Sequence, residues 1–219
     1  MAAIEIHPSV PQAAPQTVAQ LRGLAVSLLS DQLRRNRGTR GLVPYHRPAP
    51  MVGTAVTVKT RGGDNLAILR AYDHCRPGDV MVVDAEGDLS NALVGGIMTL
   101  GAARMGLAGM VLDGAIRDVA EIRERVFPVY ARGVTHRGPY KDGPGAINVP
   151  VSVGGMSVLP GDIVVGDQDG IVAIAPEEVD TVIAGALKQH AAEEATIQAI
   201  REGRWDRSFV DDLESRCKN

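Results

Sequence analysis

Two glycines and an Arg-Asp pair have the residue types and spacing to bind a small anion beside a cation. Gly95-Gly96 precedes a helix-like segment, and Arg117-Asp118 follows a short apolar run. A helix that begins at a glycine turn presents free N–H groups and the positive end of its dipole to an anion. Arginine offers a planar fork to a carboxylate, and aspartate suits a hard cation such as Mg²⁺. Together these residues indicate a site for a small 2-oxo acid.

The same residues also have ordinary structural explanations. A Gly-Gly pair before a helix is often only a turn, and neighbouring Arg and Asp side chains often form a solvated surface pair. The site interpretation therefore requires that two segments meet, namely a helix predicted from Ile97 to Met105 and a buried strand predicted over residues 109–112. In open α/β folds, ligands bind where strands end and helices begin.

Apolar periodicity and turn residues predict the elements that must position this site. Strands are expected at 54–59, 80–83, 127–131, 147–153, 156–158, 163–165 and 171–174, and further helices at 17–36, 65–75, 119–125 and 176–203. Strands alternate with helices through the middle of the chain, which predicts an α/β fold with a mixed sheet layered by helices. Thr17 with Gln20 resembles a capping box, and residues 167–170 are expected to turn a hairpin.

The chain is predicted to have three parts. Residues 1–16 form a proline-containing N-terminal arm, 17–203 a single α/β domain, and 204–219 a polar C-terminal tail. A length of 219 residues suits one large domain with such extensions. The arm is expected to be extended and to pack on the body or on a neighbour. The long terminal helix is expected to contact a neighbouring subunit, because the core does not need all of it.

Composition excludes several classes of partner. A net charge of -3 and an aromatic content of 3% argue against nucleic-acid binding. No segment has the apolar length of a membrane span and no secretory signal is recognisable, so no membrane association is expected. Cys75 and Cys217 have no CxxC partner, which is typical of a reduced, cytoplasmic protein. The basic cluster formed by Arg34, Arg35, Arg37 and Arg40 is expected to be a solvated helix end.

Four blocks of the sequence follow one another in a specific order and spacing. They read GDVMVVDAEGD, VGGIMTLGAARMGLAGMVLDGAIRD, FPVYARG and PGDIVVGDQDGIVAI. In this order they resemble the RraA-like family, which includes the regulator of ribonuclease E activity and the 4-hydroxy-4-methyl-2-oxoglutarate/4-carboxy-4-hydroxy-2-oxoadipate aldolases. The resemblance covers roughly residues 45–200. It implies an α/β/α swivelling-domain fold and homotrimers or homohexamers with sites at subunit interfaces.

The resemblance also implies roles for individual residues. It assigns Arg117 to the carboxylate and C–O group of a pyruvyl unit, and Asp118 to Mg²⁺ or Mn²⁺. The backbone amides that hold the carboxylate in the aldolases correspond to those of Ile97 and Met98. These implied roles agree with the anion and cation chemistry of the residue types themselves.

Two acidic positions complete what the resemblance implies. An acidic residue from the C-terminal helix of a neighbouring subunit corresponds to Glu193 or Glu194. The aldolases commonly carry another acidic residue where this chain has Gly96. Because Gly96 lacks this acid, the substrates known for the aldolases are a weaker expectation for this chain than metal binding is. The acidic residues of segment 84–88 are candidates to replace it.

The function predicted from the sequence is that of a divalent-metal-dependent lyase. It would cleave a C–C bond of a 2-oxo acid to release pyruvate, with oxaloacetate decarboxylase activity. The segment 94–118 contains no lysine, so it offers no Schiff-base nucleophile. The alternative is a non-enzymatic, protein-binding regulator of a ribonuclease, but such regulators typically lack the aspartate that this chain keeps as Asp118. A methyltransferase is not supported, because no nucleotide-binding glycine motif is present.

Overall fold

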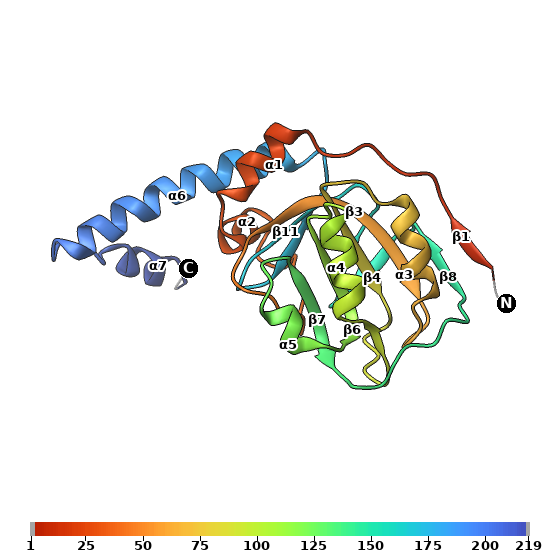
Figure 1. Ribbon diagram of the computed structural model, residues 1–219. Coiled ribbons are helices and arrows are strands. Elements are labelled where there is room, and N and C mark those ends of the chain that lie inside the picture. Colours follow the sequence, from red (N-terminus) through yellow and green to blue (C-terminus); the bar gives the residue numbers. More distant parts are fainter. Residues whose placement is uncertain (1–2, 218–219) are drawn as a thin grey trace.

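The computed structural model describes residues 3–217 as an α/β fold (Figure 1). Its helices are α1 (Pro15–Arg22), α2 (Val26–Gln32), α3 (Leu66–Ala71), the 3-10 turn η1 (Tyr72–His74), α4 (Gly96–Arg104), α5 (Val119–Arg123), α6 (Val179–Arg201) and α7 (Phe209–Cys217). Its strands are β1 (Ile4–Ile6), β2 (Val43–Pro44), β3 (Met51–Thr60), β4 (Asp79–Asp84), β5 (Ala92–Val94), β6 (Gly109–Ile116), β7 (Val129–Val134), β8 (Gly145–Ile147), β9 (Val151–Val153), β10 (Met156–Val158), β11 (Ile163–Gly166) and β12 (Ile171–Ile174).

Four parallel strands, β3-β4-β6-β7, form the centre of the large sheet. Antiparallel neighbours extend it: β8 and β11 pair with the two halves of β3, β12 pairs with β11, and β2 pairs with β7. Strands β4 and β6 are buried along their whole length. Strands covered on both faces are expected to be continuously apolar, which is why they appear as unbroken apolar runs in the sequence.

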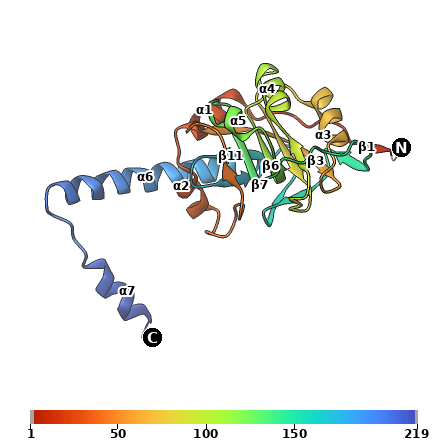
Figure 2. The same ribbon diagram turned by 60° about the horizontal axis from the view of Figure 1, so that its bottom comes forward.

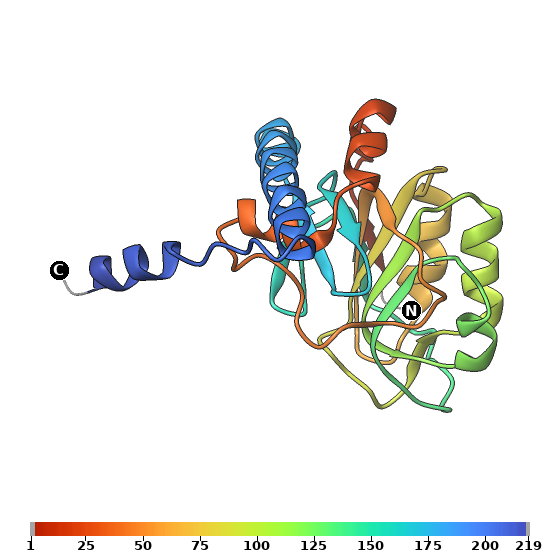
Figure 3. The same ribbon diagram turned by 90° about the vertical axis from the view of Figure 1, so that its left-hand side faces the viewer.

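Helices lie on both sides of the sheet (Figure 3). Helices α3, α4 and α5 cover one face, and α1, α2 and α6 lie on the other, against β11 and β12. The β9–β10 hairpin closes a third core cluster, which includes the buried Tyr130. The predicted α/β class and helix-layered mixed sheet are confirmed.

Three local expectations had different outcomes. The single helix expected over residues 17–36 is instead two helices, α1 and α2, separated at Gly23. The capping box at Thr17 is wrong, because α1 begins at Pro15 with Ala14 at its N-cap and no side-chain cap. Proline is well placed there, since the first-turn N–H that it lacks would have had no partner. The hairpin at residues 167–170 is confirmed by the antiparallel pairing of β11 with β12.

Both ends of the described chain extend from the body (Figures 1 and 2). In the arm, β1 pairs in parallel with β8, and at the other end α6 runs outward and is followed by α7. Residues 218–219 of the expected tail lie outside the described part, and the division into arm, domain and tail stays a prediction. Among the described residues, no helix is both long and apolar enough to span a membrane.

Buried Asp64 joins the start of α3 to the loop before β8. Its Oδ1 accepts the Leu66 N–H at 2.9 Å, and its Oδ2 accepts the N–H groups of Asp142 at 2.8 Å and Gly143 at 3.1 Å. Arg61 adds a bond to Oδ2 at 3.0 Å. Burial raises the pKa of Asp64, but the hydrogen bonds to the carboxylate outweigh burial and lower the pKa below its ordinary 3.8.

We expect Asp64→Asn to destabilise the protein by about 2 kcal/mol at neutral pH, because the amide turns a donor toward buried N–H groups. Since the folded-state pKa is lowered, the carboxylate's contribution is fully present above pH 3.8 and is lost as the pH falls through the lower folded value. The thermal unfolding temperatures of Asp64→Asn and of the unmodified protein should therefore become equal in acid. A difference that grows in acid would contradict this role. Asp73→Asn, at an exposed pair with Arg70, is the matched control.

Candidate functional site

The ends of β5 and β6 bring the two predicted halves of the site together. β5 pairs in parallel with the end of β6, so that Val94 lies opposite Ile116. The Arg117 N–H donates to the Val94 carbonyl at 3.0 Å. Gly95 therefore lies beside Arg117 and Asp118, although α4 and β6 separate them in the sequence.

Asp118 adopts a backbone conformation that directs its carboxylate to the start of α4. Its φ of 59° and ψ of 36° lie in the left-handed region, which few residues other than glycine adopt and which aspartate tolerates. Its Oδ2 accepts the Gly96 N–H at 2.9 Å. Its Oδ1 has no hydrogen bond in the part of the chain that the structure describes. An unusual backbone conformation of this kind is common at functional sites.

The N-terminus of α4 offers an anion two N–H groups. Gly95 is the N-cap residue in an extended conformation, and the helix begins at Gly96. The N–H groups of Ile97 and Met98 follow in the first turn, where an α-helix has no internal acceptor for them. Together with the positive end of the helix dipole, these groups form a suitable position for a carboxylate.

A cavity of about 380 Å³ opens beside these groups, a size suited to a small molecule. Its lining comes from α3, the start of α4, the residues after β6 and the loop before β8: Asn65, Leu69, Gly95, Ile97, Met98, Arg117, Asp118, Gly138, Pro139 and Lys141. Most residues singled out from the sequence therefore share one cavity. Gly96 lies next to it, bonded to Asp118.

The Arg117 guanidinium forms a loose ion pair with its neighbour Asp118, without a hydrogen bond. The Nε atom lies 3.9 Å from Asp118 Oδ2, which is too long for a hydrogen bond, and the side chain is 44% exposed. Gly138 packs close by, because a Cβ at that position would lie 3.1 Å from a guanidinium nitrogen. Asn91 holds this loop by donating to the Gly138 carbonyl at 2.6 Å. Arg117 is thus positioned beside the cavity with polar atoms that can bind a ligand.

Among the lining residues that the sequence did not identify are two with polar side chains, Asn65 and Lys141. Asn65 is 2% exposed, and its Nδ2 donates to the Leu93 carbonyl at 3.0 Å. Its Oδ1 has no partner among the described residues, so it can accept a hydrogen bond from a ligand. Lys141 is exposed and brings a second cationic group to the cavity. Both lie in segments remote from residues 94–118, and only the folded chain shows that they meet.

Two acidic residues of segment 84–88, Asp84 at the end of β4 and Asp88, have structural roles. The Asp84 carboxylate is 7% exposed and accepts the Ser152 N–H at 3.2 Å, which ties β4 to β9. Asp88 Oδ1 accepts the backbone N–H of Ser90 at 3.0 Å. Neither contact directs a carboxylate toward Gly96. The suggestion that this segment replaces an acid at position 96 finds no support in these contacts.

The donors around Asp118 fit a Mg²⁺ ion that keeps much of its water. Mg²⁺ binds oxygen and is commonly held by one or two carboxylates, with water and substrate oxygens completing its coordination. No group of three His, Cys, Asp or Glu side chains that could hold a metal is present within the described residues. A cation here would depend on Asp118, water and a bound 2-oxo acid.

Glu193 and Glu194 lie in the second half of α6, and α6 runs outward from the body (Figure 2). Both are exposed, and Glu193 Oε1 accepts a hydrogen bond from Gln189 at 2.9 Å. Neither side chain lines the cavity of its own chain. The expectation that they serve a neighbouring subunit stays a prediction.

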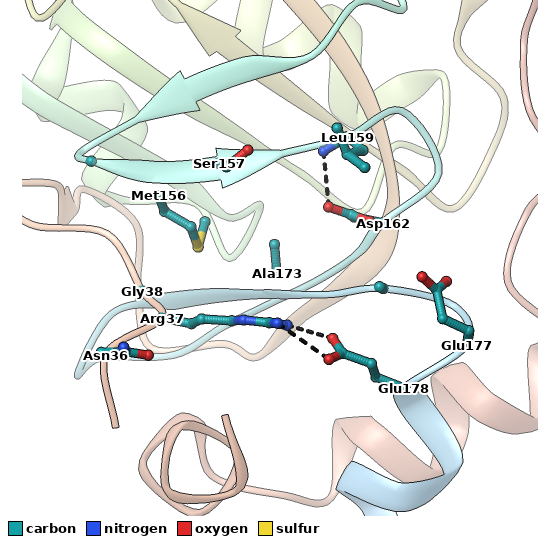
Figure 4. Close-up of a pocket in the computed structure, with 12 residues that line it drawn as sticks. Asn36, Arg37, Gly38, Met156, Ser157, Leu159, Asp162, Ala173, Glu177 and Glu178 are labelled. Atoms are coloured by element: carbon teal, nitrogen blue, oxygen red, sulfur yellow. Dashed lines mark hydrogen bonds and ion pairs between the residues drawn. The ribbon is translucent and has the colours of Figure 1, made fainter. Parts of the chain in front are cut away.

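A second cavity, of about 470 Å³, lies between segment 36–38 and the start of α6 (Figure 4). Arg37 points toward Glu178 there and donates to both of its carboxylate oxygens. Arg35 pairs with Asp31 at 2.9 Å. Two arginines of the basic cluster are therefore paired within the chain, as a solvated helix end would be.

Several known proteins and one family model match most of the chain. A family model described as "RraA-like: Aldolase/RraA" matches residues 26–173. A Halalkalibacterium halodurans protein, provisionally named a 4-hydroxy-4-methyl-2-oxoglutarate aldolase, is 39% identical over 192 residues, covering 87% of this chain and 91% of that protein. RraAS2 of Streptomyces coelicolor, described as an unusual member of the RNase ES inhibitor RraA protein family, superposes with a TM-score of 0.78 and 27% identity, covering 85% and 98% of the two chains.

An uncharacterised Pseudomonas syringae protein has the same fold, with a TM-score of 0.79, 26% identity and coverage of 90% and 93%. The family match includes the whole of α4, β6 and the residues that follow them. The family resemblance inferred from the four sequence blocks is therefore confirmed. The chain belongs to the RraA-like family of aldolases and RraA proteins.

Proposed function

We propose that this protein is a divalent-metal-dependent lyase that cleaves a C–C bond of a small 2-oxo acid and releases pyruvate. The observation that carries this proposal is the grouping of Arg117, Asp118 and the first-turn N–H groups of α4 around one cavity. The name of the H. halodurans relative supports 4-hydroxy-4-methyl-2-oxoglutarate as the substrate class. 4-Carboxy-4-hydroxy-2-oxoadipate and oxaloacetate are the related substrates that we would include.

In this proposal the start of α4 and Arg117 bind the pyruvyl end of the substrate. The N–H groups of Ile97 and Met98 donate to the carboxylate, and the Arg117 guanidinium pairs with its negative charge. Lys141 suits the second carboxylate of a dicarboxylic substrate. Asn65 Oδ1 is placed to accept a hydrogen bond from a substrate hydroxyl.

Breaking the C3–C4 bond leaves its electron pair on the pyruvyl fragment as an enolate, while the 4-hydroxyl loses its proton. A bound Mg²⁺ or Mn²⁺ would supply Lewis-acid stabilisation of this charge. Arg117 places a second positive group where the charge develops. Protonation at C3 then yields pyruvate. Oxaloacetate decarboxylation forms the same enolate, so we expect it as an accompanying activity.

Lys141 is better suited to recognising charge than to covalent catalysis. A Schiff-base lysine is activated by desolvation or by a cationic neighbour that keeps its amine neutral. Lys141 lies exposed on the loop before β8, so it is not desolvated. Although segment 94–118 contains no lysine, the cavity does contain the amine of Lys141. Because Lys141 is exposed, we favour metal-assisted chemistry over a Schiff base.

We also propose that the protein assembles as a homotrimer or homohexamer in which α6 reaches a neighbouring cavity. The outward part of α6 exposes apolar side chains of Leu187, Ile197 and Ile200, at 50%, 39% and 45%. Exposed apolar groups on a projecting helix favour a protein interface. In such an assembly, Glu193 or Glu194 would be the acidic residue that a neighbour contributes.

The alternative function is regulation of a ribonuclease by protein binding. The Streptomyces relative is described as belonging to a family of RNase ES inhibitors. The basic cluster Arg34, Arg35, Arg37 and Arg40 is the only feature of this sequence that would favour such a role, and Arg35 and Arg37 are paired with acidic residues. The enzyme is the better-supported proposal, because the cavity combines anion-binding and cation-binding groups.

We expect Arg117→Ala to lower kcat/KM for pyruvate release by roughly 100-fold or more, since it removes charge stabilisation of the enolate. Arg117→Lys keeps the charge without the planar fork and should recover only part of the activity. Pyruvate release from 4-hydroxy-4-methyl-2-oxoglutarate and from oxaloacetate, in EDTA-treated protein with Mg²⁺ or Mn²⁺ restored, measures both. Arg104→Ala, in the last turn of α4, is the matched control. Normal turnover by Arg117→Ala would exclude the assigned role.

Asp118→Asn is expected to remove metal-dependent turnover and weaken Mn²⁺ binding while the protein still folds. Asparagine tolerates the left-handed conformation, and its oxygen can still accept the Gly96 N–H. Calorimetric titration of Mn²⁺ into EDTA-treated protein measures binding without relying on turnover. Metal-dependent activity equal to that of the unmodified protein would refute this assignment. Absence of turnover by the unmodified protein, together with capture of a ribonuclease, would favour the regulator.

A further inference from the structure

The carboxylate of Glu121 lies in the space that a side chain at position 96 would occupy. A Cβ placed on Gly96 would lie 3.1 Å from the carboxyl carbon of Glu121 and closer still to its Oε2. This Cβ would be about as far from Glu121 Oε2 as the Cβ of an aspartate is from its own carboxylate oxygens. Glu121 thus brings a carboxylate to the place where an acidic residue at position 96 would bring its own.

Glu121 and Asp118 both lie at the start of the short helix α5. Asp118 directly precedes the helix in a left-handed conformation, Glu121 lies within the helix, and both side chains approach Gly96. The Cβ placed on Gly96 would also lie 3.5 Å from the Cβ of Asp118. The two carboxylates therefore flank the first residue of α4, whose N–H already bonds to Asp118.

Arg125 holds Glu121 in this position. Its NH2 group donates to Glu121 Oε2 at 3.0 Å, and its NH1 group donates to the Gly96 carbonyl at 2.9 Å. The Arg125 side chain is 26% exposed, so the start of α4 and the Glu121 carboxylate share one partly buried anchor. No hydrogen bond from the described residues reaches Glu121 Oε1.

The adjoining cavity has a separate feature that indicates a ligand. Asn65, which is 2% exposed, lines the same cavity as Asp118 and has an Oδ1 atom without a partner among the described residues. A buried acceptor without a partner is costly unless something donates to it. This atom does not depend on the acidic pair, so the cavity that the pair adjoins has an unpartnered acceptor of its own.

We propose that Glu121 is the second carboxylate of the cation site and holds the hydration shell of a divalent cation at Asp118. This inference rests on the proposed metal-dependent function and extends it to a residue that no sequence pattern singled out. Mg²⁺ keeps several waters in protein sites and uses few carboxylates, so a carboxylate beside Asp118 acts through those waters. Gly96 is then required because a side chain there would displace Glu121.

The test measures Mn²⁺ binding by calorimetry, with and without pyruvate, on the EDTA-treated full chain. Glu121→Gln is expected to raise the dissociation constant about tenfold, the size of effect typical of groups that support metal ligands. Glu124→Gln removes the same charge from the C-cap of α5, where the side chain makes no contact with Gly96, and should bind Mn²⁺ normally. Thermal unfolding of each variant reports separately on the fold.

A charge-swap variant separates this role from support of Arg125. In Gly96→Asp/Glu121→Ala the carboxylate moves to position 96, where aspartate suits the first turn of a helix. We expect it to regain most of the Mn²⁺ affinity that Glu121→Gln loses. Failure to regain it, with a lowered unfolding temperature in both variants, would assign Glu121 only the structural task of holding Arg125.

The remaining outcomes distinguish this inference from the function on which it rests. Unchanged Mn²⁺ affinity in Glu121→Gln, with weakened binding in Asp118→Asn, would overturn the role of Glu121 and leave the proposed cation site intact. Unchanged affinity in Asp118→Asn, or no Mn²⁺ binding by the unmodified protein, would count against the proposed function itself and so against both. Loss in Glu121→Gln and recovery in the charge-swap variant would establish the second carboxylate.

Discussion

The parallel pairing of β5 with the end of β6 is the contact on which the candidate site depends. Val94 lies opposite Ile116, so the chain leaves both strands at the same level of the sheet. Arg117 can then bond to the Val94 carbonyl, and Asp118 can reach the first N–H of α4. A shift of one residue in this register would turn Arg117 away from the helix, because successive side chains of a strand point to opposite faces.

The charges around the cavity are arranged in two groups of opposite sign. The N-terminus of α4, Arg117 and Lys141 form a positive side, and Asp118 forms a negative side. Glu121 adds a second carboxylate next to the cavity, beside Gly96. A 2-oxo acid that chelates a divalent cation needs both kinds of group close together. Arg117 and Asp118 form an ion pair at 3.9 Å without a hydrogen bond, so both side chains keep polar atoms that can bind a ligand.

Backbone conformation and side-chain size restrict which residues can stand next to the start of α4. Asp118 adopts a left-handed conformation, and its bond to Gly96 helps offset the cost. Glycine at position 95 is required for a related reason, because a Cβ there would lie 3.0 Å from the Arg117 side chain and closer to the Asp118 carboxylate. The two glycines therefore allow close approach as well as forming a turn.

The sequence by itself determined the α/β class, the buried strands and the segments that carry the site. Continuous apolar runs identified β4 and β6, because strands covered on both faces need no alternation. It set the end of β6 too early, since Asp113 looked like a turn residue. Asp113 is in fact 5% exposed and accepts the Gly154 N–H at 2.7 Å. Such a partner, far away in the chain, leaves no local signal.

Only the tertiary structure decided which other residues surround the cavity. The sequence did not single out Asn65 or Lys141, although the glycine-rich loop that carries Lys141 is of a kind that often reaches a site. Asn65 and Lys141 line the cavity and Glu121 lies beside Gly96 because of where α3, the loop before β8 and α5 lie in space. Sequence patterns report which residues are buried and which elements form, because those depend on local periodicity. Contacts between distant segments depend on strand register and loop closure. For that reason the sequence showed an acid missing at Gly96, and only the fold showed that the carboxylate of Glu121 lies there.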